Sequence, residues 1–183
     1  ILIKNFYYPE DFRIKDGPKK IIETRLLIKE KDDWKALNYV WRDNQKDADL
    51  NYIGKKLNIS WTHTDGIKKS TVYNVPNNNQ CKNCHINGKD ISPIGPTAAQ
   101  LNRKYNMVSN QINQLEFYDK KGLLKNLPDH DNLPKFAVWD NEQSGSVEDR
   151  ARAYLDINCA HCHQPQGSAK NSGLDLRLIQ TNT

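Results

Sequence analysis

The sequence contains one pattern twice, first as Cys81-Lys82-Asn83-Cys84-His85 and again as Cys159-Ala160-His161-Cys162-His163. These pairs use all four cysteines of the chain. On a helical turn, residues i, i+3 and i+4 project from one face. Two thiols spaced in this way can add to the two vinyl groups of one porphyrin, and the imidazole that follows then points at the iron. The pattern therefore predicts two covalently attached c-type haems, with His85 and His163 as proximal iron ligands.

Other chemistries for paired cysteines fit the sequence less well. A structural zinc site could use four cysteines, but the 74 residues between Cys84 and Cys159 are many for a ribbon or finger. Zinc also gives no reason for a histidine after each pair. A thioredoxin-like pair would need a βαβ unit, and the sequence does not alternate in that way. Disulfides across such short loops would be strained, so we interpret both pairs as haem attachment sites.

The composition allows one sizeable domain or two small ones. The chain has 183 residues, of which 37% are hydrophobic, and a formal net charge of +5. Its densest basic residues are isolated doublets such as Lys19-Lys20, which indicate a solvated surface and no nucleic-acid partner. No stretch reaches the ~20 apolar residues of a transmembrane helix. Residues 1–9 predict a strand and lack the regions of a signal peptide, so we expect a mature or trimmed product.

Residues 1–76 predict an antiparallel β-sheet module. Runs at 21–29 and 34–42 flank a polar turn, and Leu37, Tyr39 and Trp41 share one face of the second run. Runs at 57–62 and 70–75 flank a turn that contains Asp65-Gly66. We expect two hairpins of one sheet, joined by a loop or short helix at 43–49.

Residues 77–183 predict a mainly helical module that holds both haems. One helix is expected at 97–105, with Pro96 at its start, and the next begins at a cap on Ser109 or Asn110. An irregular connection follows at 127–145. A capping box from Ser146 to Asp149 then starts a helix that runs into Cys159. Its apolar face is expected to hold Val147, Ala151, Tyr154 and Leu155. The fold class is therefore α+β.

The first motif is followed by a segment that resembles class I cytochromes c. Gly95-Pro96 lies eleven residues beyond His85 and is similar to the Gly-Pro of that family. The resemblance implies that the Pro96 carbonyl accepts the hydrogen bond of His85 and fixes its ring. Pro96 at a helix start is compatible with this role.

A second resemblance covers nearly the whole chain. The segments that carry it are Ile22 to Leu27, Tyr39 to Trp41, Val75 to His85, Pro93 to Pro96, Asn113 to Leu115, Arg150 to His163 and Ser172 to Leu176. Together they resemble a family of exported bacterial dihaem c-type proteins, known mostly as haem-binding proteins of uncertain role. The resemblance supports the fold and the cofactor and adds little about partners. The family pattern continues to a Met-Pro-Pro segment, which this chain lacks, so we expect a piece of a longer protein.

The ligand on the far side of each iron is less clear from the sequence. Met107 is the only methionine, and it follows the predicted helix at 97–105 as a distal ligand loop would, so we favour it for haem 1, the haem at His85. Haem 2, at His163, has no methionine or histidine after it. His130 is preferred there because its loop lies between the motifs, and His63 on the sheet module is the alternative. His161 cannot easily turn to the far side of its own haem.

These expectations favour an electron carrier over an enzyme. We expect a dihaem c-type cytochrome that relays single electrons between redox partner proteins or neighbouring copies of itself, as in an extracellular conduit. Because c-type cytochromes are assembled outside the cytoplasm, the compartment is periplasmic or extracellular. The alternative is a dihaem peroxidase, which needs one haem with an open side and acid–base groups above it. A haem-based sensor or structural surface protein is a third hypothesis.

Overall fold

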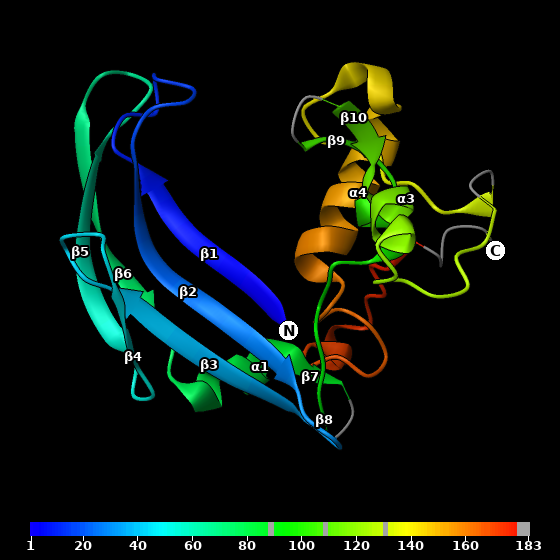
Figure 1. Cartoon of the computed structure of the whole chain (residues 1–183), viewed down its shortest axis with the longest axis horizontal. Helices are drawn as coiled ribbons and strands as arrows, with labels where there is room; N and C mark the ends of the chain where they lie inside the picture. The colour runs from blue at the N-terminus through cyan, green and yellow to red at the C-terminus, as the bar shows by residue number, and fades with distance from the viewer. Residues whose placement is uncertain (88–89, 108–109, 130–131, 179–183) are drawn as a thin grey trace. The chain divides into compact units, whose positions relative to one another are not determined.

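Antiparallel strands make up most of the first half of the chain in the computed structural model, which describes residues 1–87, 90–107, 110–129 and 132–178 (Figure 1). The chain divides into two units, Ile1–Ser92 and Pro93–Thr183. Strands and helices are both present, so the predicted α+β class is confirmed. Within the described residues, none of the helices has the length and apolar character needed to cross a membrane.

The first unit contains a four-stranded sheet in the order β1-β2-β3-β4. Its strands are β1 (Leu2–Pro9), β2 (Lys19–Lys29), β3 (Trp34–Trp41) and β4 (Ala48–Leu50). The predicted hairpin is confirmed, since β2 and β3 pair antiparallel from Lys29 opposite Trp34 to Glu23 opposite Val40. The segment predicted as a loop or short helix forms a turn and then β4.

The face of β3 that is fully buried differs from the prediction. Asn38 and Val40 are buried, whereas Leu37, Tyr39 and Trp41 are half-buried on the opposite face. The alternation of side chains along β3 correctly separates two faces. Both faces carry large side chains, however, so hydropathy alone does not indicate which face is buried. The buried face therefore holds polar groups, Glu23 and Asn38, beside the apolar core.

The second predicted hairpin forms a sheet of its own. Strands β5 (Lys55–Thr62) and β6 (Lys68–Val75) pair antiparallel around the turn at Gly66, whose φ of +79° suits glycine. The expectation of one continuous sheet is thus wrong. Thr62 instead bonds to the segment after β1: its N–H donates to Glu10 at 2.9 Å and its carbonyl accepts from Phe12 at 2.9 Å.

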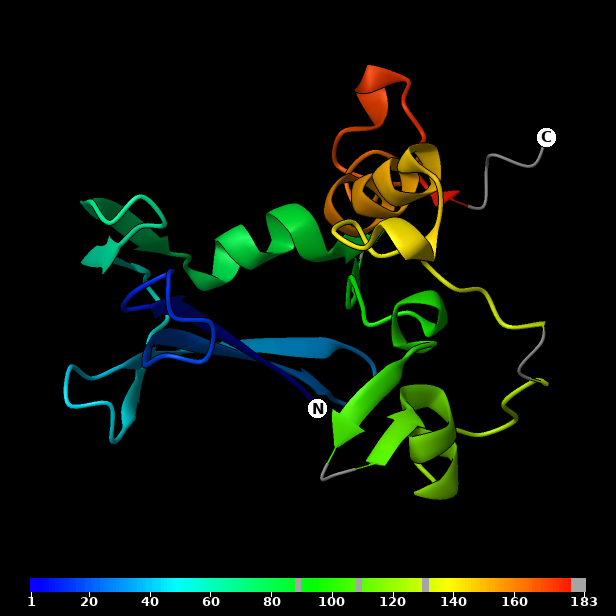
Figure 2. The same ribbon diagram turned by 90° about the horizontal axis from the view of Figure 1, so that it is seen from above.

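Helix α1 (Asn78–His85) completes the first unit and carries the first motif. It follows β6 and contacts β3, as the two views show (Figures 1 and 2). The short strands β7 (Ile86–Asn87) and β8 (Asp90–Ile91) come next and pair with each other. Because α1 packs on the sheet, the first compact unit includes it and extends to Ser92.

The second unit is mixed rather than mainly helical. It contains α2 (Ala98–Leu101), β9 (Lys104–Met107), β10 (Asn110–Asn113), α3 (Gln114–Lys120), the 3-10 turn η2 (Glu142–Ser144), α4 (Val147–Cys159) and the 3-10 turn η3 (Lys170–Ser172). Strands β9 and β10 lie side by side and lead into α3 (Figure 2).

The helix predicted at 97–105 is shorter than expected. It ends at Leu101 because the buried Asn102 turns its side chain to distant backbone groups: Nδ2 donates to the carbonyls of Leu133 and Pro134, each at 3.2 Å. The residues after it join β9. The following helix, α3, is capped by Asn113, whose Oδ1 accepts from Leu115 at 2.9 Å. Ser109, one of the predicted caps, lies outside the described residues, and Asn110 belongs to β10.

Helix α4 begins at the predicted capping box. Ser146 Oγ accepts from the Asp149 N–H at 3.1 Å, and Asp149 accepts from the Ser146 N–H at 3.0 Å. Its buried face is not the predicted one. Ala153 is buried at 1% exposure, whereas Val147 and Tyr154 are 74% and 52% exposed. The small Ala153 side chain permits close packing, which a pattern of large apolar residues does not reveal.

Candidate functional site

The first motif lies at the end of α1. Cys81, Cys84 and His85 occupy its last turns, so the i, i+3, i+4 arrangement predicted from the sequence is present on a helix. Cys81 is half-buried and is not in a disulfide, and burial raises the pKa of its thiol. Cys81 Sγ lies 3.6 Å from the Asn77 carbonyl oxygen.

His85 is oriented by the short hairpin that follows α1. Its Nδ1 lies 3.1 Å from the carbonyl oxygen of Ser92, and the Ser92 N–H donates to the His85 carbonyl at 2.6 Å. A carbonyl can only accept, so the hydrogen-bond network assigns the ring proton to Nδ1. The lone pair is then on Nε2, the arrangement found in metal-binding histidines.

The carbonyl that orients His85 is therefore not the one that the resemblance to class I cytochromes implied. Ser92 takes the place expected for Pro96. The physical reason is local: β7 and β8 reverse the chain immediately after His85, which brings Ser92 back to the histidine within seven residues. Pro96 instead precedes Thr97, the cap of α2.

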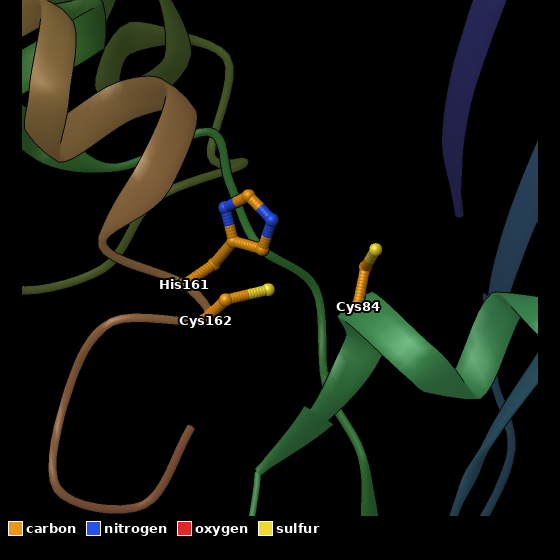
Figure 3. Close-up of side chains that lie close together, drawn as sticks. All are labelled: Cys84, His161 and Cys162. Atoms are coloured by element: carbon orange, nitrogen blue, oxygen red, sulfur yellow. The ribbon is translucent and has the colours of Figure 1, made fainter. Parts of the chain in front are cut away.

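The second motif begins at the last residue of α4, Cys159. The His163 N–H donates to the Cys159 carbonyl at 2.9 Å, and the Cys162 N–H donates to the same carbonyl at 3.1 Å. These bonds continue the helical turn through the motif, although α4 ends at Cys159. Both half-buried thiols are outside any disulfide. Figure 3 shows Cys84 on the last turn of α1, and His161 and Cys162 on the turn after α4.

His163 is oriented by Ser172. Its Nδ1 lies 2.9 Å from Ser172 Oγ. Ser172 donates its one hydroxyl hydrogen to the Ala169 carbonyl at 2.8 Å, so its oxygen accepts from His163. The network again assigns the proton to Nδ1 and the lone pair to Nε2. The two motif histidines thus have the same tautomer, fixed by different partners.

The segment after the second motif folds back on it. The Ala169 N–H donates to the Cys162 carbonyl at 3.0 Å, and the Leu176 N–H donates to the His163 carbonyl at 3.0 Å. Gly167 makes this possible, because a Cβ at that position would lie 2.1 Å from the Cys162 carbonyl oxygen. Glycine is required here by the close approach of two backbone segments.

Two hydrogen bonds tie the start of α1, which carries the first motif, to β3 and to the loop after β4. Asn38 on β3 donates from Nδ2 to the Pro76 carbonyl at 3.3 Å. The Asn78 N–H donates to the Tyr52 carbonyl at 3.3 Å. These contacts explain why α1 belongs to the first unit. Each unit therefore contains one motif.

The distal ligands predicted from the sequence are described only in part. Met107 ends β9, but its side chain lies outside the described structure, as does His130. His63 lies in the turn after β5 with its ring centroid 6.1 Å from that of Phe12. The eight residues of β6 span about 26 Å between this turn and α1. The turn that holds His63 and the start of α1 thus lie at opposite ends of β6, and the role of His63 as an iron ligand stays a prediction.

The residues present in each motif fit a c-type haem. Each supplies two thiols for thioether bonds and one imidazole whose Nδ1 is held by a hydrogen bond and whose Nε2 can bind iron. Sequence reasoning missed the two residues that orient these rings, Ser92 and Ser172. Ser172 falls within a segment that resembles the dihaem family, which is the one signal that pointed to it. No family model, curated protein or solved structure matches the chain.

Proposed function

We propose that the protein is a dihaem c-type cytochrome that transfers single electrons between redox partners. One observation carries the proposal: in both motifs, the cysteines and the histidine lie on one helical turn, and the histidine has its Nδ1 proton held by a neighbour. Redox-active disulfides need no such bond, and zinc gives no reason for a histidine directly after each cysteine pair. Metal-ligating histidines regularly have such a bond.

The residues of the chain have separate tasks in this proposal. The thiols of Cys81 and Cys84, and of Cys159 and Cys162, hold one porphyrin each by thioether bonds. His85 and His163 bind iron through Nε2, and Ser92 and Ser172 fix the orientation of the two rings. A bound c haem supplies a one-electron Fe(III)/Fe(II) couple.

The two haems are expected to differ in potential. The half-buried His85 donates to the backbone carbonyl of Ser92, whereas His163 donates to the hydroxyl of the exposed Ser172, and these two acceptors are unequal. Because hydrogen bonds to the axial histidine raise its basicity, they tune the potential of the iron. Two unequal sites suit a relay. Attachment of c haem outside the cytoplasm makes the periplasm or the cell exterior the compartment, with redox proteins or further copies of the chain as partners.

The proposal is tested by the spectra of the purified full chain. Sharp low-spin spectra in both oxidation states, reversible reduction and no reaction with cyanide or hydrogen peroxide are expected of a carrier. A high-spin haem that binds cyanide and turns over peroxide would contradict the electron-carrier assignment and support a dihaem peroxidase. Absence of covalent haem would contradict both.

A further inference from the structure

A buried ionic cluster lies in the first unit, apart from the two motifs. Glu23 on β2 has 0% exposure, and its Oε1 accepts from Arg25 Nη2 at 2.5 Å and from the Tyr73 hydroxyl at 2.5 Å. Its other oxygen, Oε2, is buried without a hydrogen-bond partner among the described residues. The guanidinium of Arg25 also stacks on Phe6, with 4.1 Å from Cζ to the ring centroid.

The cluster faces the helix that carries the first motif. In the sheet register, Arg25 lies directly opposite Asn38. Asn38 in turn holds the Pro76 carbonyl at the start of α1. Residues directly opposite each other in a sheet project from the same face, so Arg25 and Asn38, the residue that anchors α1, lie on one face of the sheet.

The charges of the cluster affect the pKa of the Cys81 thiol. Burial is the main cause of the raised pKa of the Cys81 thiol, the charge of Arg25 acts to lower it, and the charge of Glu23 acts to raise it. Burial and then the Glu23 carboxylate raise the pKa of Tyr73, so its hydroxyl remains a donor to Glu23. Both charges of the cluster, the buried carboxylate and the half-buried guanidinium, therefore act on the Cys81 thiol.

Stability alone gives a weak reason for this arrangement. Replacing a buried ion pair by apolar residues of similar size is often neutral or stabilising, because both charges lose their hydration on burial. A carboxylate oxygen without a partner adds to that cost. A fixed charge beside a redox centre, in contrast, has a large effect where water is excluded. A negative charge stabilises ferric iron, and a positive charge stabilises ferrous iron.

We propose that Glu23 and Arg25 set the reduction potential of the haem attached at Cys81, the carboxylate lowering it and the guanidinium raising it. The inference rests on the proposed function, because it requires a haem at the first motif. It assigns the sheet module a role in electron transfer beyond holding α1. Tyr73 acts as a positioning residue by stabilising the charge of Glu23.

The test is a spectroelectrochemical titration of the full chain with both haems attached. The two potentials are assigned to their haems from variants in which only one of the two motifs is intact. Glu23→Gln should raise the potential of haem 1 by a roughly tenfold change in its Fe(III)/Fe(II) equilibrium, which equals about 59 mV for one electron. Arg25→Gln should lower it, and Arg25→Lys, which keeps the charge, should restore most of the wild-type value. The reduction potential of haem 2 should stay the same in all of these variants.

The matched control is the exposed pair Arg42 and Asp49 on the same sheet, which has the same charges in water. Arg42→Gln and Asp49→Asn should leave both potentials unchanged. Should Glu23→Gln fail to fold, Tyr73→Phe is the second variant. It removes one hydrogen-bond donor from the Glu23 carboxylate, so the negative charge is less neutralised and the potential of haem 1 should fall. Potentials of haem 1 that stay at the wild-type value in the folded variants would overturn this inference while leaving the proposed function intact. A wild-type chain without covalent haem would overturn both.

Discussion

Ser172 holds His163 in a single tautomer. The serine donates its only hydroxyl hydrogen to Ala169 at 2.8 Å and therefore accepts from His163 Nδ1 at 2.9 Å. The imidazole that follows the second cysteine pair thus presents Nε2 as a lone pair. This hydrogen bond links the second motif to Ser172, nine residues further along the chain.

Ser172→Ala should raise the reduction potential of haem 2 and leave haem 1 unchanged. Loss of the acceptor makes the imidazole less basic, which stabilises ferric iron less. Because Ser172 is exposed, the effect should be no larger than one ordinary hydrogen bond of about 1 kcal/mol, or about 40 mV for one electron. A redox titration of both haems measures it. The neighbouring exposed Ser168→Ala is the control, and an equal shift in that variant would refute the assignment.

Gly167→Ala should damage the second site selectively. A Cβ would lie 2.1 Å from the Cys162 carbonyl oxygen, so the loop or the motif must move. Forced overpacking of this kind costs roughly 1–3 kcal/mol. We expect less haem at the second motif and a lower thermal midpoint, with normal attachment at the first. Full occupancy of both motifs at the wild-type midpoint would show that the close approach is not required.

Met107→Leu tests the predicted distal ligand of haem 1. Leucine keeps the volume of methionine but has no sulfur, so a packing role would survive the change. If Met107 binds iron, the potential of haem 1 should fall by roughly 0.1 V, within the range of about 0.8 V that axial ligands span. The charge-transfer band of ferric iron bound to a thioether should disappear with it. An unaltered spectrum and potential would mean that Met107 only packs.

The distal ligand of haem 2 requires a separate comparison. His130→Ala and His63→Ala are each examined by low-temperature EPR of the ferric protein. We expect His130→Ala to change the low-spin signal of haem 2, because two imidazoles give a low potential and a characteristic spectrum. Loss of the signal in His63→Ala instead would move the ligand to the sheet module. If the signal persists in both variants, the ligand is neither histidine.

Asp149 makes the start of α4 sensitive to acid. The bonds from Ser146 hold the pKa of Asp149 below its usual value. A carboxyl with a lowered folded-state pKa contributes stability above its unfolded pKa of about 3.9, and this is lost as pH falls through the folded value. Asp149→Asn should therefore lose less stability than wild type between pH 6 and pH 3, as measured by thermal unfolding. An acid sensitivity in Asp149→Asn equal to that of wild type would contradict this role of the carboxyl.

Local signals predicted the parts of the fold that neighbours in sequence determine. Period-two runs and the turn at Asp65-Gly66 predicted both hairpins, and the Ser146 box predicted the start of α4. Long-range bonds determine the rest. Asn38 bonds to the Pro76 carbonyl and holds α1 in the first unit, which extends to Ser92, and Asn102 ends α2 by bonding to Leu133 and Pro134.

The candidate site shows the same division. The spacing of Cys81, Cys84 and His85 on one turn follows from helical geometry and could be predicted. The partner of His85 could not, because the resemblance pointed to Pro96 whereas the reversal at β7 and β8 brings Ser92 to the ring. The burial of Glu23 could not be predicted either, because a glutamate in a strand is ordinarily solvated. Its bonds to Arg25 and Tyr73 become apparent only in the structure.

The most direct test of the account is the intact mass of the exported, purified protein after acid–acetone extraction. Thioether bonds survive this treatment, whereas coordinated haem is removed. We predict a mass that exceeds the polypeptide by two haem groups, and Cys84→Ser and Cys162→Ser should each weaken attachment at the changed motif alone. A mass equal to the bare polypeptide, or zinc in place of iron at the cysteines, would contradict the claim that the two motifs attach haem.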